Sequence, residues 1–235
     1  MSTDVERLRS ARDHVRERIA DACAPAGRDP AAVTLVAVSK TVPAERLVAA
    51  VAAGLTILGE NRVQEALPKV AAVPGATWHI IGPLQSNKAR RAVETFEMIQ
   101  SVDSVPLATR LDRLAAELRA GKRLTVLLQV NVDDDASKAG LSPVDLEASL
   151  PQILALPALE VRGLMTIGRL VGSAEEARPT FRALRSLSER LRPRHVGLGP
   201  ELSMGMSDDY PVAVEEGATI VRVGRALFGE RHEHA

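Results

Sequence analysis

The fold class follows from a short apolar stretch, Val33-Thr-Leu-Val-Ala-Val-Ser39, which is rich in β-branched residues. It lacks the polar alternation of a half-exposed strand, so it predicts a strand buried on both faces, as in a parallel sheet covered by helices. Similar runs follow along the chain at Thr56–Gly59, Thr77–Ile81, Phe96–Val102, Leu124–Val132, Leu159–Ile167, His195–Leu198 and Thr219–Val223. The sequence therefore predicts eight buried strands.

Helical patterns separate these strands. They cover Pro43–Ala53, Val63–Ala72, Asn87–Glu94, Pro106–Ala120, Pro143–Leu156, Ala174–Leu191 and Asp209–Glu216. Eight strand–helix units in a chain of 235 residues fit an α/β fold of the (β/α)8 TIM-barrel type. A doubly wound open sheet is the alternative, because a strand count does not establish closure. Two of the strands, Thr56–Gly59 and His195–Leu198, are short enough for the count to be wrong by one.

An additional helix is predicted before the barrel. Its apolar residues recur every three to four positions, at Val5, Leu8, Ala11, Val15, Ile19 and Ala22. Such spacing forms one stripe along a helix, and Pro25 and Gly27 end it. No linker or low-complexity segment interrupts the chain. We therefore expect a single domain over residues 1–235, with the helix at about 4–24 and the barrel at about 33–229.

The composition argues against several classes of protein. There are 30 basic and 30 acidic residues, and this zero formal net charge disfavours a nucleic-acid or anionic-membrane surface. The single cysteine, Cys23, excludes an internal disulfide and a cysteine metal cluster. Asp133-Asp-Asp135 lacks the ligand spacing of a calcium loop, and we expect no metal. The charged segment Met1–Arg18 and the lack of an apolar stretch of about 20 residues predict a cytoplasmic protein without membrane contact.

Lys40 is the first residue with a chemical interpretation, because it directly follows the first predicted strand. In a TIM barrel the chemistry gathers at the carboxyl ends of the strands. Burial favours the neutral form of a lysine amine, which is the form that attacks an aldehyde. The alternative interpretation is a solvated lysine just past the end of its strand.

Two glycine-containing turns late in the chain, Leu202–Asp209 and Val221–Gly229, suggest a phosphate site. Ser207 is predicted to cap a helix that begins at Asp208, where free N–H groups would stabilise an anion. Gly224 adds a second point of close backbone approach, although an ordinary capped helix remains the alternative. Phosphate sites between the loops after strands seven and eight recur in barrels. Together with an aldehyde-reactive amine, they suggest pyridoxal 5′-phosphate.

Arg222 and His79 are two further candidates. Arg222 lies two residues before Gly224 on the same strand, and a protonated guanidinium can bond a pyridine nitrogen only when that nitrogen carries no proton. Such a contact would weaken the ring as an electron sink. The alternative for Arg222 is a surface ion pair. His79 has no second histidine at metal-ligand spacing, so a packed or cofactor-adjacent role is favoured.

Six segments closely resemble the pyridoxal phosphate homeostasis protein family. They are Ala37-Val-Ser-Lys-Thr41, Gly59-Glu-Asn61 with Val63-Gln-Glu65, Trp78-His-Ile-Ile-Gly-Pro-Leu-Gln-Ser-Asn-Lys88, Gly163-Leu-Met-Thr166, Leu202-Ser-Met-Gly-Met-Ser-Asp-Asp209 and Val221-Arg-Val-Gly224. The resemblance runs from about Val33 to Gly229, and the Trp78–Lys88 block is highly specific. Members look like the N-terminal barrel of alanine racemase without its second domain.

The resemblance implies that Lys40 holds pyridoxal 5′-phosphate covalently as a Schiff base. It also implies that Ser207 and the Gly224 backbone hold the phosphate and that Arg222 faces the pyridine nitrogen. The ring pocket would be lined by Asn61, His79 and Met165. The full set of expected cofactor-binding residues is Lys40, Asn61, His79, Met165, Ser203, Ser207, Arg222, Gly224 and Arg225.

Two positions depart from the family pattern. Arg225 stands where relatives often carry Ser or Thr, so charge would replace a hydroxyl contact to the phosphate. Arg62 stands where an aromatic residue is frequent, which changes the expected contacts near the second strand.

The favoured function is a non-catalytic protein that buffers pyridoxal 5′-phosphate or delivers it to apoenzymes, and we expect a monomer without catalytic residues. A racemase-like enzyme is the alternative, and it needs a base on each face of the cofactor. In the alanine racemase family the second base is a tyrosine from the extra domain. Here the one tyrosine, Tyr210, follows the phosphate turn, while His79 stays open as a base. A barrel for another phosphate ester would leave the position of Lys40 unexplained.

Overall fold

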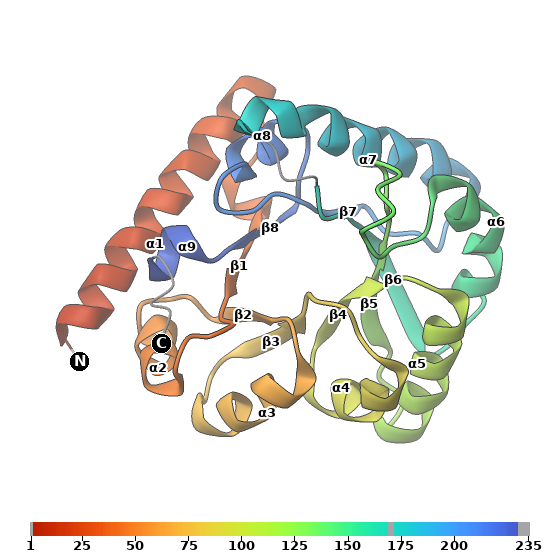
Figure 1. Cartoon of the computed structure of the whole chain (residues 1–235), viewed down its shortest axis with the longest axis horizontal. Helices are drawn as coiled ribbons and strands as arrows, with labels where there is room; N and C mark the ends of the chain where they lie inside the picture. The colour runs from red at the N-terminus through yellow and green to blue at the C-terminus, as the bar shows by residue number, and fades with distance from the viewer. Residues whose placement is uncertain (1, 169–171, 230–235) are drawn as a thin grey trace.

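Eight parallel strands close into a barrel in the order β1 to β8 in a computed structural model that describes residues 2–168 and 172–229 (Figure 1). The strands are β1 (Thr34–Val38), β2 (Ile57–Glu60), β3 (Thr77–Ile80), β4 (Met98–Val102), β5 (Leu124–Gln129), β6 (Leu159–Met165), β7 (Glu201–Ser203) and β8 (Ile220–Val223). β8 pairs with β1, with Thr34 opposite Ile220 and Val36 opposite Arg222. This pairing confirms the TIM barrel and excludes the open sheet.

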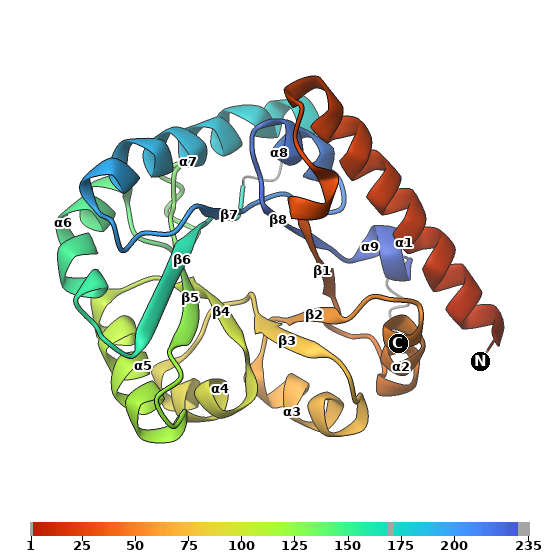
Figure 2. The ribbon, with the colours of Figure 1, turned by 180° about the vertical axis from the view of Figure 1, so that it is seen from behind.

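Helices surround the barrel on its outer face (Figures 1 and 2). They are α2 (Ala44–Ala52), α3 (Val63–Ala72), α4 (Ala89–Thr95), α5 (Val105–Leu118), α6 (Pro143–Leu154), α7 (Arg178–Leu191), α8 (Tyr210–Glu215) and α9 (Arg225–Phe228). Each predicted helical interval matches one of these helices within a few residues, and Val63–Ala72 matches in full. The short helix α9 has no predicted counterpart.

The predicted N-terminal helix is confirmed as α1 (Ser2–Cys23), which crosses the outside of the barrel beside α9 (Figure 1). Leu8, Val15 and Ile19 are almost fully buried on the inner side of α1. The Arg18 guanidinium lies over the ring of Tyr210, 5.5 Å from its centroid, and so joins α1 to α8. In the described part of the chain, no helix combines the length and apolar character needed to cross a membrane.

The prediction of a seventh strand over His195–Leu198 is wrong. That segment is a turn in which the Leu198 N–H donates to the His195 carbonyl at 2.9 Å. The next residues pass tightly over β6, because a Cβ on Gly199 would lie 2.4 Å from the Arg162 carbonyl oxygen. The strand follows at β7, where Leu202 is the single apolar residue of three. β7 escapes a search for apolar runs for that reason.

Two layers of packed side chains position the site. The larger layer lies between the strands and the helices, and a smaller cluster fills the barrel. The interior cluster contains Val36, Leu127, Met165 and Ile220 from four strands, together with Ile81 directly after β3. Nearer the carboxyl ends of the strands the barrel interior becomes polar. The buried polar side chains there include His79, Gln100, Ser203 and Arg222.

Candidate functional site

Lys40 follows β1 at the carboxyl end of the barrel and is partly buried. Val36 and Val38 pack inside the barrel, and Lys40 lies in the turn two residues beyond Val38. The next residue, Thr41, has a φ of 65°, which is unusual for a β-branched residue. Its hydroxyl donates to the Lys40 carbonyl oxygen at 2.5 Å. Strained backbone of this kind clusters at functional sites.

A buried ion pair fixes the residue before Lys40 from the other face of the sheet. The Ser39 hydroxyl donates to Glu60 Oε1 at 2.7 Å. Lys69 Nζ on α3 donates to the same Glu60 oxygen and to the Ser39 carbonyl, each at 2.8 Å. Glu60 is fully buried, and its Oε2 has no hydrogen-bond partner among the described residues. The cluster thus ties the end of β1 to β2 and α3.

Asn61 and Met165 also lie at this end of the barrel. Asn61 follows β2, and the loop after β3 packs closely on it, because a Cβ on Gly82 would lie 2.6 Å from the Asn61 carbonyl oxygen. Met165 ends β6, is fully buried and belongs to the interior cluster. Met165 therefore contributes an apolar floor, while Asn61 lies on a rim loop held in place by Gly82.

His79 and Arg222 are joined across the barrel by a chain of hydrogen bonds. His79 Nδ1 lies 3.0 Å from Gln100 Nε2 on β4. The Ser203 hydroxyl on β7 donates to Gln100 Oε1 at 2.6 Å, and Arg222 NH1 on β8 donates to Ser203 Oγ at 2.6 Å. The four residues are at most 5% exposed. These hydrogen bonds bring together three predicted site residues, His79, Ser203 and Arg222, and Gln100 links His79 to Ser203.

Arg222 is a buried cation held by neutral groups. Besides Ser203, its guanidinium donates through NH2 to the Thr166 carbonyl oxygen at 2.7 Å. It forms no ion pair with any residue that the structure describes. Burial lowers the pKa of Arg222 to about 10, against the opposing charge of Asp209. The guanidinium is therefore protonated at neutral pH, and the alternative of a surface ion pair is wrong.

The turn after β7 differs from its prediction. Ser207 does not cap a helix starting at Asp208, because α8 begins at Tyr210 and its capping residue, Asp209, makes no side-chain cap. The Asp209 carboxylate instead accepts from the Met206 N–H at 2.6 Å and closes the turn. A helix cannot begin two residues earlier while this turn is formed.

Ser207 joins the two loops that were expected to bind phosphate. Its Oγ accepts from the Gly224 N–H at 3.1 Å and from the Ala226 N–H at 3.5 Å. A Cβ on Gly224 would lie 3.3 Å from Val38 Cβ, so this backbone also lies against the end of β1. A hydroxyl and two backbone N–H groups thus converge beside the strand that leads to Lys40. Such a group of donors suits a phosphate.

Arg225 lies at the exposed rim of these loops. Its guanidinium donates to the Asp208 carboxylate, and both side chains are more than half exposed. The pair offsets the negative charge of Asp208, which would otherwise repel an anion bound nearby. The positive charge of Arg225, which we expected at the phosphate, is thus partly neutralised by the Asp208 carboxylate.

The burial of His79 has a consequence for stability. Burial lowers the pKa of its imidazole from 6.5 to about 4. Between these values the unfolded chain binds a proton that the folded chain does not, so stability falls as the pH falls. The difference between the two pKa values corresponds to about 3 kcal/mol of unfolding free energy, at 1.36 kcal/mol per pKa unit. We expect the full unfolding free energy above pH 6.5 and a progressive loss of this amount as the pH falls to 4.

Urea unfolding of the wild type and a His79→Asn variant at pH 7 and pH 4.5 measures this effect. The wild type should lose more unfolding free energy over this range than the variant. His14→Asn is the matched control, because the His14 side chain is 68% exposed and its removal should leave the pH dependence unchanged. Equal losses in wild type and His79→Asn would contradict the expectation.

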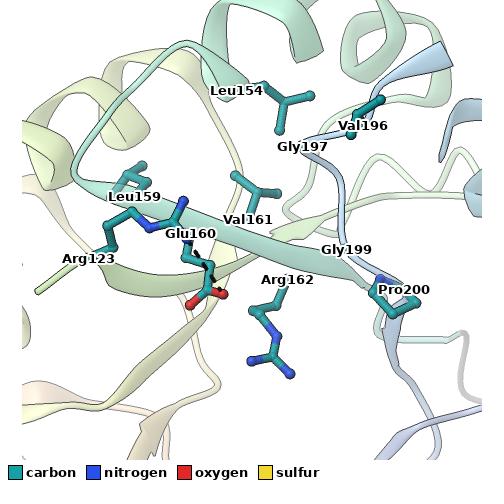
Figure 3. Close-up of a pocket in the computed structure, with 10 residues that line it drawn as sticks. All are labelled: Arg123, Leu154, Leu159, Glu160, Val161, Arg162, Val196, Gly197, Gly199 and Pro200. Carbon is teal, nitrogen blue, oxygen red and sulfur yellow. Dashed lines mark ion pairs between the residues drawn. The ribbon is translucent and has the colours of Figure 1, made fainter. Parts of the chain in front are cut away.

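A separate cavity of about 430 Å³ lies at the opposite ends of the strands (Figure 3). It is lined by Arg123, Leu154, Leu159, Glu160, Val161, Arg162, Val196, Gly197, Gly199 and Pro200. Leu154 ends α6, and the other residues precede β5 and β7 or form the first half of β6. Arg123 and Glu160 form an ion pair at the edge of the cavity. None of the predicted site residues lines this cavity. Among the described residues there is also no cluster of His, Cys, Asp and Glu suited to a metal ion.

Sequence reasoning missed Gln100, Glu60 and Lys69. Gln100 is followed by Ser101 inside the apolar run Phe96–Val102, and two adjacent polar residues in a buried strand are a signal of an interior hydrogen-bond network. Glu60 and Lys69 gave no comparable signal, because a charged residue at a strand end and another on a helix are both common at surfaces.

Comparison with known proteins places this site in context. A family model for the alanine racemase N-terminal domain matches residues 11–232. The chain is 46% identical over 234 residues to the pyridoxal phosphate homeostasis protein of Pseudomonas aeruginosa, covering 98% of this chain and 97% of that protein. It is 41% identical over 227 residues to the protein of the same name from Escherichia coli strain K12, covering 92% and 94%.

Solved structures show the same relationship. PipY of Synechococcus elongatus, with pyridoxal 5′-phosphate (PLP) bound, matches at a TM-score of 0.80 and 46% identity, covering 92% of this chain and 100% of PipY. An alanine racemase of Clostridium difficile 630 in complex with cycloserine matches at a TM-score of 0.75 and 13% identity, covering 97% of this chain and 61% of the racemase. The second match shows a shared fold.

Proposed function

Since this chain belongs to the pyridoxal phosphate homeostasis protein family and matches the alanine racemase N-terminal domain, we propose that it holds pyridoxal 5′-phosphate covalently on Lys40. In this proposal the chain buffers the cofactor or delivers it, without catalytic turnover. PipY, which is 46% identical, is a relative with this cofactor bound.

The observation that carries the proposal is the arrangement on two adjacent strands. β1 leads to the Lys40 amine, and its neighbour β8 carries the buried cation Arg222, followed by the Gly224 N–H. An amine, a cation bonded to neutral groups and backbone donors therefore lie at one end of the barrel. They suit an aldehyde, a ring nitrogen and a phosphate, which are the three functional groups of the cofactor.

Each residue has a defined role in this proposal. When bound, the cofactor supplies an electrophilic aldehyde and an aromatic ring that can accept electrons. Lys40 anchors it, and Ser207 with the Gly224 and Ala226 N–H groups holds its phosphate. Asn61, His79 and Met165 line the ring pocket, with Ser203 supporting Arg222 and Arg225 adding charge near the phosphate. Arg222 donates to the ring nitrogen and keeps a proton from it, which weakens the ring as an electron sink.

The position of Tyr210 favours a carrier over a racemase. Tyr210 is the single tyrosine of the chain, is 1% exposed and packs under Arg18 of α1, in the core outside the strands. Its phenol therefore has no access to the barrel interior, where an α-carbon would react. The proposed partners are PLP-dependent apoenzymes that receive the cofactor, and the proposed state is a monomer.

Proton exchange tests the absence of turnover. The purified chain loaded with PLP is incubated in D2O with a panel of L-amino acids, and loss of the α-proton signal is followed by NMR. We expect no exchange beyond that of free PLP at equal concentration, while the absorption spectrum confirms that the cofactor is bound. Exchange at a rate typical of enzymes would overturn the carrier proposal and leave cofactor binding intact.

A further inference from the structure

The hydrogen-bond chain between Arg222 and His79 has a fixed direction. An arginine side chain carries N–H donors and no acceptor, so Arg222 must donate to Ser203 Oγ. The Ser203 hydroxyl then has its own proton to donate, and in the described part of the chain its other partner is Gln100 Oε1. The cation at one end thereby sets the direction of the next bond.

The orientation of the Gln100 amide follows from this order. The Ser203 Oγ to Gln100 contact is 2.6 Å, a length typical of an O–H···O bond and short for an N–H···O bond. In the reverse amide orientation, both Arg222 and the Gln100 N–H group would donate to Ser203 Oγ. The proton of the Ser203 hydroxyl would then have no acceptor among the described residues. Gln100 therefore accepts from Ser203 through its oxygen and presents its N–H group to His79.

We propose that Gln100 is a positioning residue that fixes His79 as the neutral tautomer with its proton on Nε2. The Gln100 N–H donates to His79 Nδ1 across 3.0 Å, so Nδ1 must carry a lone pair. A neutral imidazole has one ring proton, and it then lies on Nε2. The deep burial of His79 agrees with this form, because it lowers the pKa of the imidazole to about 4.

The consequence concerns the reactivity of the site and rests on the proposed function. With Nδ1 bonded to Gln100 and Nε2 protonated, His79 offers a ligand a hydrogen-bond donor and no free basic nitrogen. Removing a proton from a bound amino acid would require the opposite tautomer and a reversed Gln100 amide. The hydrogen-bond chain thus excludes His79 as the second base of a racemase.

Long-range ¹H–¹⁵N NMR of the full-length chain reads this tautomer directly, because protonated and unprotonated ring nitrogens have well-separated shifts. His79 is assigned by the loss of its signals in His79→Asn. We expect a single neutral tautomer protonated on Nε2 at pH 7, with and without added PLP. Protonation on Nδ1, or averaged shifts from two tautomers, would overturn the proposal.

Two variants test the role of Gln100. Gln100→Leu removes the donor, and the His79 shifts should move toward a mixture of tautomers. Gln100→Glu puts an acceptor of the same shape in its place, and the proton should move to Nδ1. Gln129→Leu is the matched control, since Gln129 is a buried glutamine on the neighbouring strand that donates to the Ala139 carbonyl, and the His79 shifts should stay unchanged.

The readouts separate this inference from the proposed function. An unchanged His79 tautomer in both Gln100 variants would contradict the positioning role whether or not PLP binds. If Gln100→Leu does not fold, the wild-type spectrum and Gln100→Glu still decide the question. If the chain does not bind PLP but His79 is the expected tautomer, the proposed function is contradicted and the positioning role of Gln100 stands.

Discussion

Replacing Lys40 with alanine should abolish the absorption band of covalently bound PLP completely. The amine of Lys40 is the group that would form the carbon–nitrogen bond, and the neighbouring amine of Lys69 is already held in an ion pair with the buried Glu60. Contacts from Ser207 and Arg222 would remain, so weak non-covalent binding should persist. Absorbance titration with PLP measures the first effect, and equilibrium dialysis measures the second.

Two control variants make the result specific. Lys40→Arg keeps a positive charge but lacks a nucleophilic amine, and it should lose the band as Lys40→Ala does. Lys122→Ala removes an exposed lysine just before β5, at the far end of the barrel, and should leave the spectrum unchanged. An unaltered band in Lys40→Ala would show that the cofactor is attached elsewhere.

Replacing Lys69 with methionine should cost about 3–5 kcal/mol of unfolding free energy, because it leaves Glu60 buried without its cation. The Glu60 side chain is fully buried, and one of its oxygens already lacks a partner within the described chain. The same change removes a donor from the Ser39 carbonyl, next to Lys40. Urea unfolding at pH 7 measures the loss.

A double variant separates the buried charge from packing. Glu60→Gln combined with Lys69→Met removes both charges and should recover a large part of the loss, because no ion then remains buried alone. Arg62→Ala breaks the neighbouring exposed pair with Glu65 and should cost no more than about 1 kcal/mol. A loss below 1 kcal/mol in Lys69→Met would show that the cluster does not stabilise this end of the barrel.

The barrel could be predicted because most of its strands are apolar runs separated by amphipathic helices. β1 lies within the predicted Val33–Ser39, and α3 has its predicted bounds. β7 could not be found in this way, because two of its three residues are polar, a glutamate and a serine. Apolar content locates strands that pack on both faces and misses a strand whose inner face is polar.

The site was predictable to the extent that chemistry follows strand ends. Lys40 could be placed at one end of the barrel because it directly follows a predicted strand. Arg222 could be placed there because it lies near the carboxyl end of another. The link from His79 through Gln100 to Ser203 could not, because it joins β3, β4 and β7 across a closed barrel whose registers the sequence does not encode locally. The bond from Gly224 to Ser207 likewise depends on how two loops pack.

Reductive trapping tests the central claim most directly. The chain is incubated with PLP, reduced with borohydride to make the carbon–nitrogen bond permanent, digested and mapped by mass spectrometry. The other lysines are Lys69, Lys88, Lys122 and Lys138. The account predicts one cofactor per chain, attached to the peptide that contains Lys40. A label on any other lysine in place of Lys40, or no label at all, would contradict it.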